Sequence, residues 1–115
     1  MIRTYLHLDV EQGQAADLVR LFKDLQILEA SVEEADCLSA ELTLSEDGRQ
    51  AIVTATWDSI EKYADWTSRS DRASYAERLS QFLATPIRPE STGAQYTIAH
   101  SVLPGRADQP MKGES

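Results

Sequence analysis

His7 is the side chain of this sequence best suited to acid–base chemistry near neutral pH. It lies in the segment IRTYLHLDV, where polar or aromatic residues alternate with aliphatic ones. Such alternation predicts a strand on which Tyr5, His7 and Asp9 share one face, successive members standing about 6.5 Å apart. Asp9 could then orient the imidazole. A base of this kind deprotonates a phenol or quinol, whose electron-rich anion can reduce dioxygen directly. The simpler alternative is a histidine in solvent or at a subunit interface.

A second group of candidates is aromatic. The stretch TWDSIEKYADWTSRSDRASYAERL contains both tryptophans and two of the four tyrosines. Trp66 follows Tyr63 by three residues, so the two side chains share one face of a helix. A flat indole can stack on an aromatic substrate, although packing between helix and sheet is the alternative for Trp66. Tyr75 lies beyond a polar break. Trp57 stands where a strand meets a helix cap, a position typical of a residue that closes one end of a core.

The elements that must position these residues follow from the hydrophobic pattern. Period-two alternation and helical spacing each recur along the chain. An Asp-Gly pair favours a tight hairpin between two strands, and Asp58 with Glu61 has the spacing of a capping box. The pattern predicts strands over about 2–10, 37–45, 50–57 and 94–102, the last containing His100, and helices over about 14–28, 59–67 and 73–84.

The order strand, helix, strand, strand, helix, strand predicts an α+β fold of the ferredoxin-like, split βαβ type (βαββαβ). Its four-stranded antiparallel sheet carries both helices on one face, with the first and third strands in the middle. The uncovered face would present Arg3, Tyr5, His7 and Asp9, a set too mixed for a dry core. A cavity enclosed between two subunits would cover it. We expect one domain over residues 1–103 and a flexible C-terminal tail over 104–115.

Composition narrows the classes of function. The net charge is −8, from 19 acidic against 11 basic residues, and Lys and Arg form no cluster. This balance argues against nucleic acid or an anionic membrane surface as a partner. The single cysteine, Cys37, excludes an internal disulfide, and no Cys/His spacing indicates a zinc site. The alternating, charged N-terminus is neither a signal peptide nor a spanning helix, so we expect a cytoplasmic protein.

Because of several of these residues and segments, the sequence resembles the antibiotic biosynthesis monooxygenase family of dimeric α+β barrels. The likeness rests on the strand exit at Trp57, the aromatic pair around a helical Trp, and the strands CLSAELTLSEDG and QAIVTATW, and it spans about residues 1–103. One departure is EEADC, where many members have Pro-Gly. The resemblance implies a homodimer whose two sheets face each other, with a pocket in each subunit between the sheet and its longer helix.

Known members include cofactor-independent oxygenases acting on anthrones or quinols, haem-degrading enzymes, and proteins without demonstrated activity, so the fold alone does not fix the function. The oxygenase branch implies a small aromatic substrate oxidised by dioxygen without metal or flavin. In that interpretation Trp66 and Tyr63 wall the pocket, His7 is the base, and Tyr75 hydrogen-bonds a substrate oxygen. That branch has an Asn one turn before the Trp and a Tyr shortly after it, where this chain has Lys62 and either Arg72 or Tyr75.

The remaining members of the uncovered face would complete the substrate contacts: Tyr5, Asp9, and Arg3, which could instead pair with an acid across the dimer. Two alternatives stay open. In the haem-degrading branch, His7 stands at the place of an assisting Asn and Tyr75 at that of the axial His; a tyrosinate can ligate ferric haem. The second alternative is a non-catalytic dimer that binds a hydrophobic metabolite or another protein.

Overall fold

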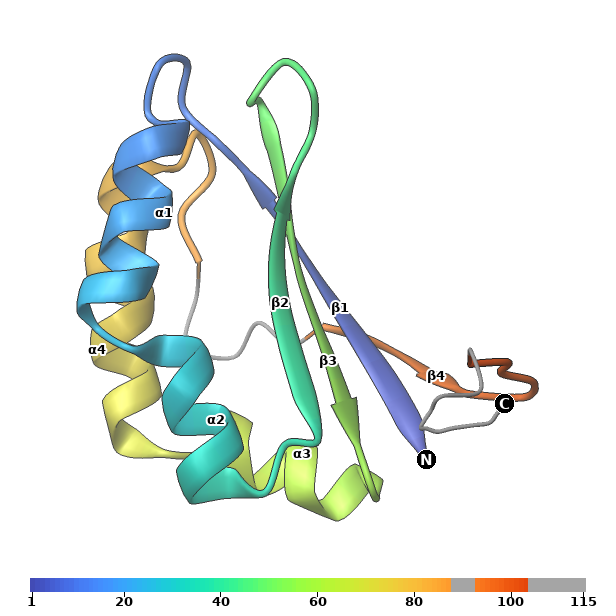
Figure 1. The fold of residues 1–115 in the computed structure, drawn as a ribbon. Coiled ribbons are helices and arrows are strands. Elements are labelled where there is room, and N and C mark those ends of the chain that lie inside the picture. Colours follow the sequence, from blue (N-terminus) through green and yellow to red (C-terminus); the bar gives the residue numbers. More distant parts are fainter. Residues whose placement is uncertain (88–92, 104–115) are drawn as a thin grey trace.

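The computed structural model describes residues 1–87 and 93–103 (Figure 1). The predicted tail from 104 to 115 lies outside the described residues. The elements follow in the order β1 (Ile2–Asp9), α1 (Ala15–Asp24), α2 (Ile27–Ala35), β2 (Ser39–Leu44), β3 (Gln50–Trp57), α3 (Ile60–Thr67), α4 (Ser70–Leu79), the 3-10 turn η1 (Ser80–Phe82) and β4 (Ala94–Thr97). Within the described residues, no helix is long and apolar enough to cross a membrane.

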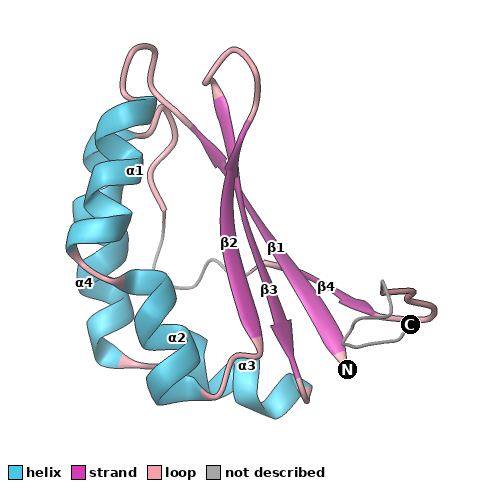
Figure 2. Ribbon diagram, viewed as in Figure 1, coloured by secondary structure: helices cyan, strands magenta, loops and turns pink. Residues whose placement is uncertain are grey.

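The sheet has the strand order β2-β3-β1-β4, and each pair of neighbours is antiparallel. The first and third strands are therefore central, which confirms the predicted ferredoxin-like arrangement. In the register, Arg3 stands opposite Thr56 on one side and Tyr96 on the other. The helices form one layer against one face of this sheet (Figure 2).

The first helical segment is interrupted, which corrects the single helix predicted over 14–28. Gln26 adopts a left-handed backbone conformation with φ of 53°, so α1 ends before it and α2 begins directly after it. Asp36, with φ of 61°, ends α2 in the same conformation. Asp is among the residues that tolerate this region, and it terminates the helix where many helices use Gly.

The second helical segment also differs in detail from the prediction. The cap of α3 is Ser59, whose hydroxyl accepts a hydrogen bond from the backbone N–H of Lys62, so the expectation that Asp58 caps this helix was wrong. The predicted polar break is confirmed, because α3 ends at Thr67 and α4 begins at Ser70. The last strand is shorter than predicted. It ends at Thr97, and His100 is exposed beyond it.

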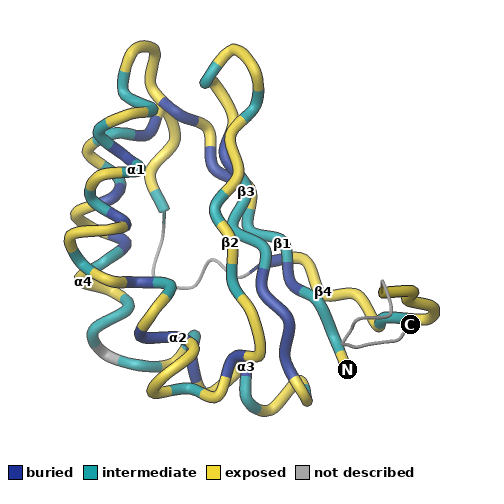
Figure 3. The backbone as a smooth tube through the Cα atoms, viewed as in Figure 1, coloured by how far each residue is buried: buried dark blue, intermediate teal, exposed yellow. Residues whose placement is uncertain are grey.

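The two faces of the sheet have different surroundings. Side chains of β1 that point toward the helices are buried at Thr4 and Leu8, and the core continues through Leu18 and Phe22 of α1. Figure 3 shows this burial between the helical layer and the sheet. The alternate residues of β1 point away from the helices, and His7 among them is exposed. A strand's period of two fixes this division.

Candidate functional site

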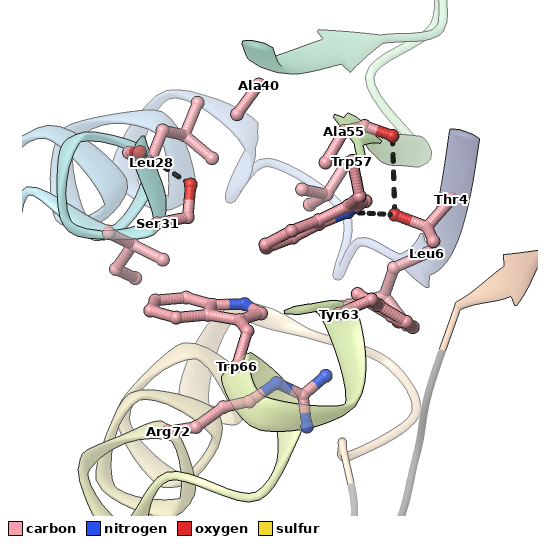
Figure 4. A pocket seen from close by; sticks show the side chains of 12 residues that line it. Thr4, Leu6, Leu28, Ser31, Ala40, Ala55, Trp57, Tyr63, Trp66 and Arg72 are labelled. Carbon is pink, nitrogen blue, oxygen red and sulfur yellow. Dashed lines mark hydrogen bonds between the residues drawn. The ribbon is translucent and has the colours of Figure 1, made fainter. Parts of the chain in front are cut away.

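Two adjoining cavities lie between the sheet and the helices, with volumes of about 50 and 70 Å³. Trp66 and Arg72 line both of them, so the two spaces meet around these side chains. The first extends toward Thr4 and Trp57, and the second toward Tyr75. Figure 4 shows the side chains that surround the first cavity. Pockets for small molecules commonly measure about 300–1,000 Å³, and the two spaces together are smaller than this, so a ring-sized ligand would need both of them and a displacement of lining side chains.

Helix α3 brings Tyr63 and Trp66 to the cavity, as their spacing predicted. Both are buried, with 5% and 8% of their surface exposed. The Tyr63 hydroxyl accepts a 2.6 Å hydrogen bond from the backbone N–H of Gly93. A Cβ at Gly93 would lie 3.0 Å from the carbonyl oxygen of Tyr5 and 3.1 Å from that hydroxyl. Glycine therefore allows the chain before β4 to approach Tyr63 closely enough to anchor it.

Trp57 forms the opposite wall and is held rigidly. Its ring is 1% exposed and lies 5.4 Å from that of Tyr63, centroid to centroid. Its indole N–H donates to the hydroxyl of Thr4 at 3.1 Å. The polar atom of this tryptophan is thus satisfied within the core. Trp57 both fills the core where β3 ends and borders the first cavity.

Trp66 and Arg72 differ from Trp57 because their donors have no acceptor. Among the described residues, neither the indole N–H of Trp66 nor the guanidinium of Arg72 makes a hydrogen bond or an ion pair, and Figure 4 draws none to either. Burial lowers the pKa of the Arg72 guanidinium, and the neighbouring Tyr63 raises it. Arginine nevertheless stays protonated at neutral pH. The cavity therefore contains unused hydrogen-bond donors, one of which carries a positive charge.

A second arginine, Arg69, also lies against Trp66 but is fully engaged. Its guanidinium carbon is 5.4 Å from the centre of the indole, a cation–π contact. The same group forms ion pairs with Glu34 at 2.6 Å and Asp71 at 3.0 Å. These hydrogen bonds raise the pKa of Arg69. Its charge is neutralised at the surface, which leaves Arg72 as the charged donor beside the cavity.

Tyr75 lines the second cavity. Burial raises the pKa of Tyr75, and the negative charges of Asp71 and Glu34 raise it further. The hydrogen bond from Tyr75 to a substrate oxygen stays a prediction.

The other predicted site residues lie on the open face of the sheet. Arg3 donates from Nε to the Thr56 hydroxyl at 3.2 Å. The ring of Tyr5 packs edge-on against Tyr96, with centroids 5.6 Å apart. A hollow beside β1 is lined by residues of both faces: Tyr5, His7 and Asp9 of the open face, Leu6 and Leu8 of the covered face, and Thr85, Pro86, Ile87 and Ala94.

The structure bears on two expectations about His7. Asp9 accepts hydrogen bonds from the Gln50 side chain at 2.8 Å and from the Thr85 hydroxyl at 3.4 Å, and among the described residues it makes none with the imidazole. His7 also lies on the opposite face of the sheet from Trp66, because residues 6 and 7 point to opposite sides and Leu6 lines the Trp66 cavity. Within one subunit, the structure does not bring His7 together with Trp66 and Tyr75.

The same separation bears on the haem alternative. His7 and Tyr75 lie on opposite sides of the sheet, so they cannot both face one haem within a subunit. The cavity that Tyr75 borders measures about 70 Å³, far too small for a porphyrin without rearrangement of the core. The residues do not fit haem. In the described part of the chain, His, Cys, Asp and Glu form no group of three that could hold a metal ion.

Comparison with known proteins places this geometry in a family. The family model described as antibiotic biosynthesis monooxygenase matches residues 1–78. The chain belongs to the antibiotic biosynthesis monooxygenase family. The matched segment of this family member contains Trp57, Tyr63, Trp66, Arg72 and Tyr75, the aromatic and charged residues of the two cavities.

Solved structures support the same family fold. A monooxygenase from the gene ActVA-Orf6 of Streptomyces coelicolor, in complex with the ligand nanaomycin D, is 25% identical, with a TM-score of 0.71 over 90% of this chain and 92% of that one. A proposed antibiotic biosynthesis monooxygenase from Deinococcus radiodurans is 16% identical, with a TM-score of 0.71 over 90% and 97%. Another, from Nitrosomonas europaea, is 12% identical, with a TM-score of 0.70 over 86% and 90%. No curated protein matches this sequence.

Sequence reasoning gave too little weight to two residues of this family member. Arg72 was considered only as a substitute for a Tyr, because the break between α3 and α4 removes the helical spacing that would relate it to Trp66. Gly93 lies outside the matched segment and before a strand, so no local pattern marked its contact with Tyr63.

Proposed function

We propose that this protein is a monooxygenase that oxidises a small aromatic substrate of the quinol or anthrone type with dioxygen, using neither metal nor flavin. The observation that carries the proposal is Trp66, a buried indole at the junction of two cavities whose N–H has no acceptor in the part of the chain that the structure describes. Tyr63 and Trp57 complete an aromatic wall against which a flat ring can pack. The Streptomyces coelicolor relative, a monooxygenase with a bound organic ligand, supports this class of function.

The reaction balances without an external reductant. An anthrone ionises when its acidic CH₂ group releases a proton to water, and the resulting anion gives up electrons to dioxygen. One oxygen atom forms the new carbonyl, and the other leaves as water with the two hydrogens of the CH₂ group, the released proton included. The protein must bind the ring and favour the anion.

The roles of the predicted site residues follow their positions. Trp66 and Tyr63 would hold the ring in place, and the ring of Tyr75 would close the second cavity. We assign no proton transfer to His7 for a substrate bound beside Trp66, because the sheet lies between them. Arg3, Tyr5, His7 and Asp9 instead belong to the open face, which we propose as the contact between the two subunits of a homodimer.

Oxygen consumption tests the function directly. Metal-free protein is incubated with a panel of naphthohydroquinones and anthrones, and oxygen uptake is compared with autoxidation. We expect uptake above autoxidation for at least one compound, and its loss in Trp66→Ala. Uptake equal to autoxidation across the panel, with binding of the same compounds intact, would identify a non-catalytic binding protein instead.

A further inference from the structure

We propose that the Trp66 cavity selects planar aromatic ligands that carry an anionic oxygen, a carboxylate or a phenolate, and that Arg72 is the residue that selects them. The inference builds on the proposed function only in the location of the ligand. It adds a substrate class and a residue that determines specificity.

Each hydroxyl group that lines the first cavity already makes a hydrogen bond, whereas two of the N–H donors there make none to the described residues. The Thr4 hydroxyl is engaged with Trp57, and the Ser31 hydroxyl donates to the carbonyl of Leu28 at 2.7 Å. The Tyr63 oxygen receives the Gly93 N–H. Against these satisfied groups stand the Trp66 indole N–H and the Arg72 guanidinium, which have no partner among the described residues. A ligand that complements this lining must therefore supply acceptors.

The charge of Arg72 narrows the choice to anions. The described residues provide no counter-ion for the half-buried guanidinium of Arg72, and a ligand oxygen with negative charge would offset the cost of burying that charge. Arg69 cannot bind the anionic group of a ligand in place of Arg72, because Glu34 and Asp71 already neutralise its charge. The protein as a whole carries a net charge of −8, so its overall field does not attract anions. Selectivity for an anion must then arise locally, from Arg72.

The planar shape follows from the other walls. Trp57, Tyr63 and Trp66 present ring surfaces, and the remaining lining is aliphatic, including Leu6 and Val53. An inorganic anion would leave these apolar surfaces without a partner. An aromatic ring bearing a single anionic group matches both parts of the lining.

The test measures binding, with matched ligand pairs and isothermal titration calorimetry at neutral pH. The first pair is 2-naphthoate and its neutral amide, 2-naphthamide. The second is 2,4-dinitro-1-naphtholate, which is ionised at neutral pH, and its methyl ether. A charge-assisted hydrogen bond typically favours the charged partner by about tenfold or more. We expect at least that preference for one anion over its neutral partner, and the pair that shows it distinguishes carboxylate from phenolate.

Three variants test whether Arg72 causes the preference for the anionic ligand. Arg72→Met removes the charge and retains the length of the side chain; we expect it to abolish the preference while the neutral ligand still binds. Arg72→Lys retains the charge and should keep part of the preference. Arg78→Met removes a charge from the exposed surface of the same helix and should leave the preference unchanged. Circular dichroism and the affinity for the neutral ligand together report whether each variant is folded.

Two results would overturn the proposal: equal affinity for anion and neutral partner in both pairs, or an anion preference that survives in Arg72→Met. If Arg72→Met does not fold, the same criteria apply to Arg72→Gln. None of these ligands needs to be oxidised, so a failure of the oxygen-uptake experiment leaves this test intact. Conversely, oxygen uptake above autoxidation without a preference for anionic ligands would support the proposed monooxygenase activity and reject the proposed role of Arg72.

Discussion

The two faces of the sheet show how burial changes what a polar side chain can do. On the helix-covered face, Trp66 and Arg72 line a cavity and have N–H donors without an acceptor among residues 1–87 and 93–103. On the open face, Asp9 is bonded to Gln50, Arg3 to Thr56, and His7 is exposed. Side chains on the open face can satisfy one another or water. On the covered face Trp57 and Tyr63 are satisfied by protein groups, but the donors of Trp66 and Arg72 have no partner among the described residues and are available to a ligand, which makes the covered face the better candidate for chemistry.

The largest expected difference between the faces is in stability. Trp57→Ala removes a fully buried ring and its bond to Thr4, and should lower the free energy of unfolding by about 3–5 kcal/mol. His7→Ala on the open face should change it by about 0.5 kcal/mol or less. Denaturant unfolding monitored by circular dichroism measures both. Similar losses in the two variants would remove the distinction between the faces.

Activity should divide in the same way. Trp66→Ala removes the wall that positions the substrate, and we expect a fall in kcat/KM on the order of 10²-fold. Trp66→Phe keeps a flat ring without the N–H and should retain more activity. His7→Ala should retain nearly all of it. Oxygen uptake provides the measurement. A loss of activity in His7→Ala as large as in Trp66→Ala would indicate that His7, on the open face, is the catalytic base.

Gly93 tests the link between the faces, since it touches Tyr5 of β1 and Tyr63 of α3. In Gly93→Ala, the new methyl group meets the Tyr5 carbonyl oxygen at 3.0 Å and the Tyr63 hydroxyl at 3.1 Å. We expect a loss of about 1–3 kcal/mol in unfolding free energy from overpacking. Ala94→Ser, at the exposed neighbouring position, is the control. If Gly93→Ala leaves the free energy of unfolding unchanged, the chain before β4 can shift away from Tyr63 without cost.

The smallest expected effect concerns the rim of the covered face. The pKa of Tyr75 is raised by burial and by the nearby carboxylates, so the folded state favours the neutral phenol. Below the ordinary tyrosine pKa of about 10, the hydroxyl is neutral in both states and imposes no cost. As the pH rises beyond that value, the unfolded state gains by ionising and the fold loses stability. Tyr75→Phe should therefore unfold less readily than wild type in alkali, which denaturant unfolding at a series of pH values above about 10 would measure.

Much of the fold followed from local patterns. Alternation in β1 and β3, the Asp-Gly turn and the helical spacing of Tyr63 and Trp66 each depend on neighbours in sequence, so these features were predictable. The interruption at Gln26 was not, because a non-glycine residue in the left-handed region carries no pattern of its own. The cap at Ser59 was misplaced by one residue for a similar reason, since Asp58 is an equally good capping residue type.

By itself, the sequence determined the family fold, the central position of the first and third strands, and the shared face of Tyr63 and Trp66. Tertiary structure alone decided two other things: that the sheet separates His7 from Trp66, and that Arg72 lines the cavity with no counter-ion among residues 1–87 and 93–103. The physical reason is that these properties depend on which layer covers each face. Alternation along a strand divides its residues into two sets, but only packing reveals which set is enclosed.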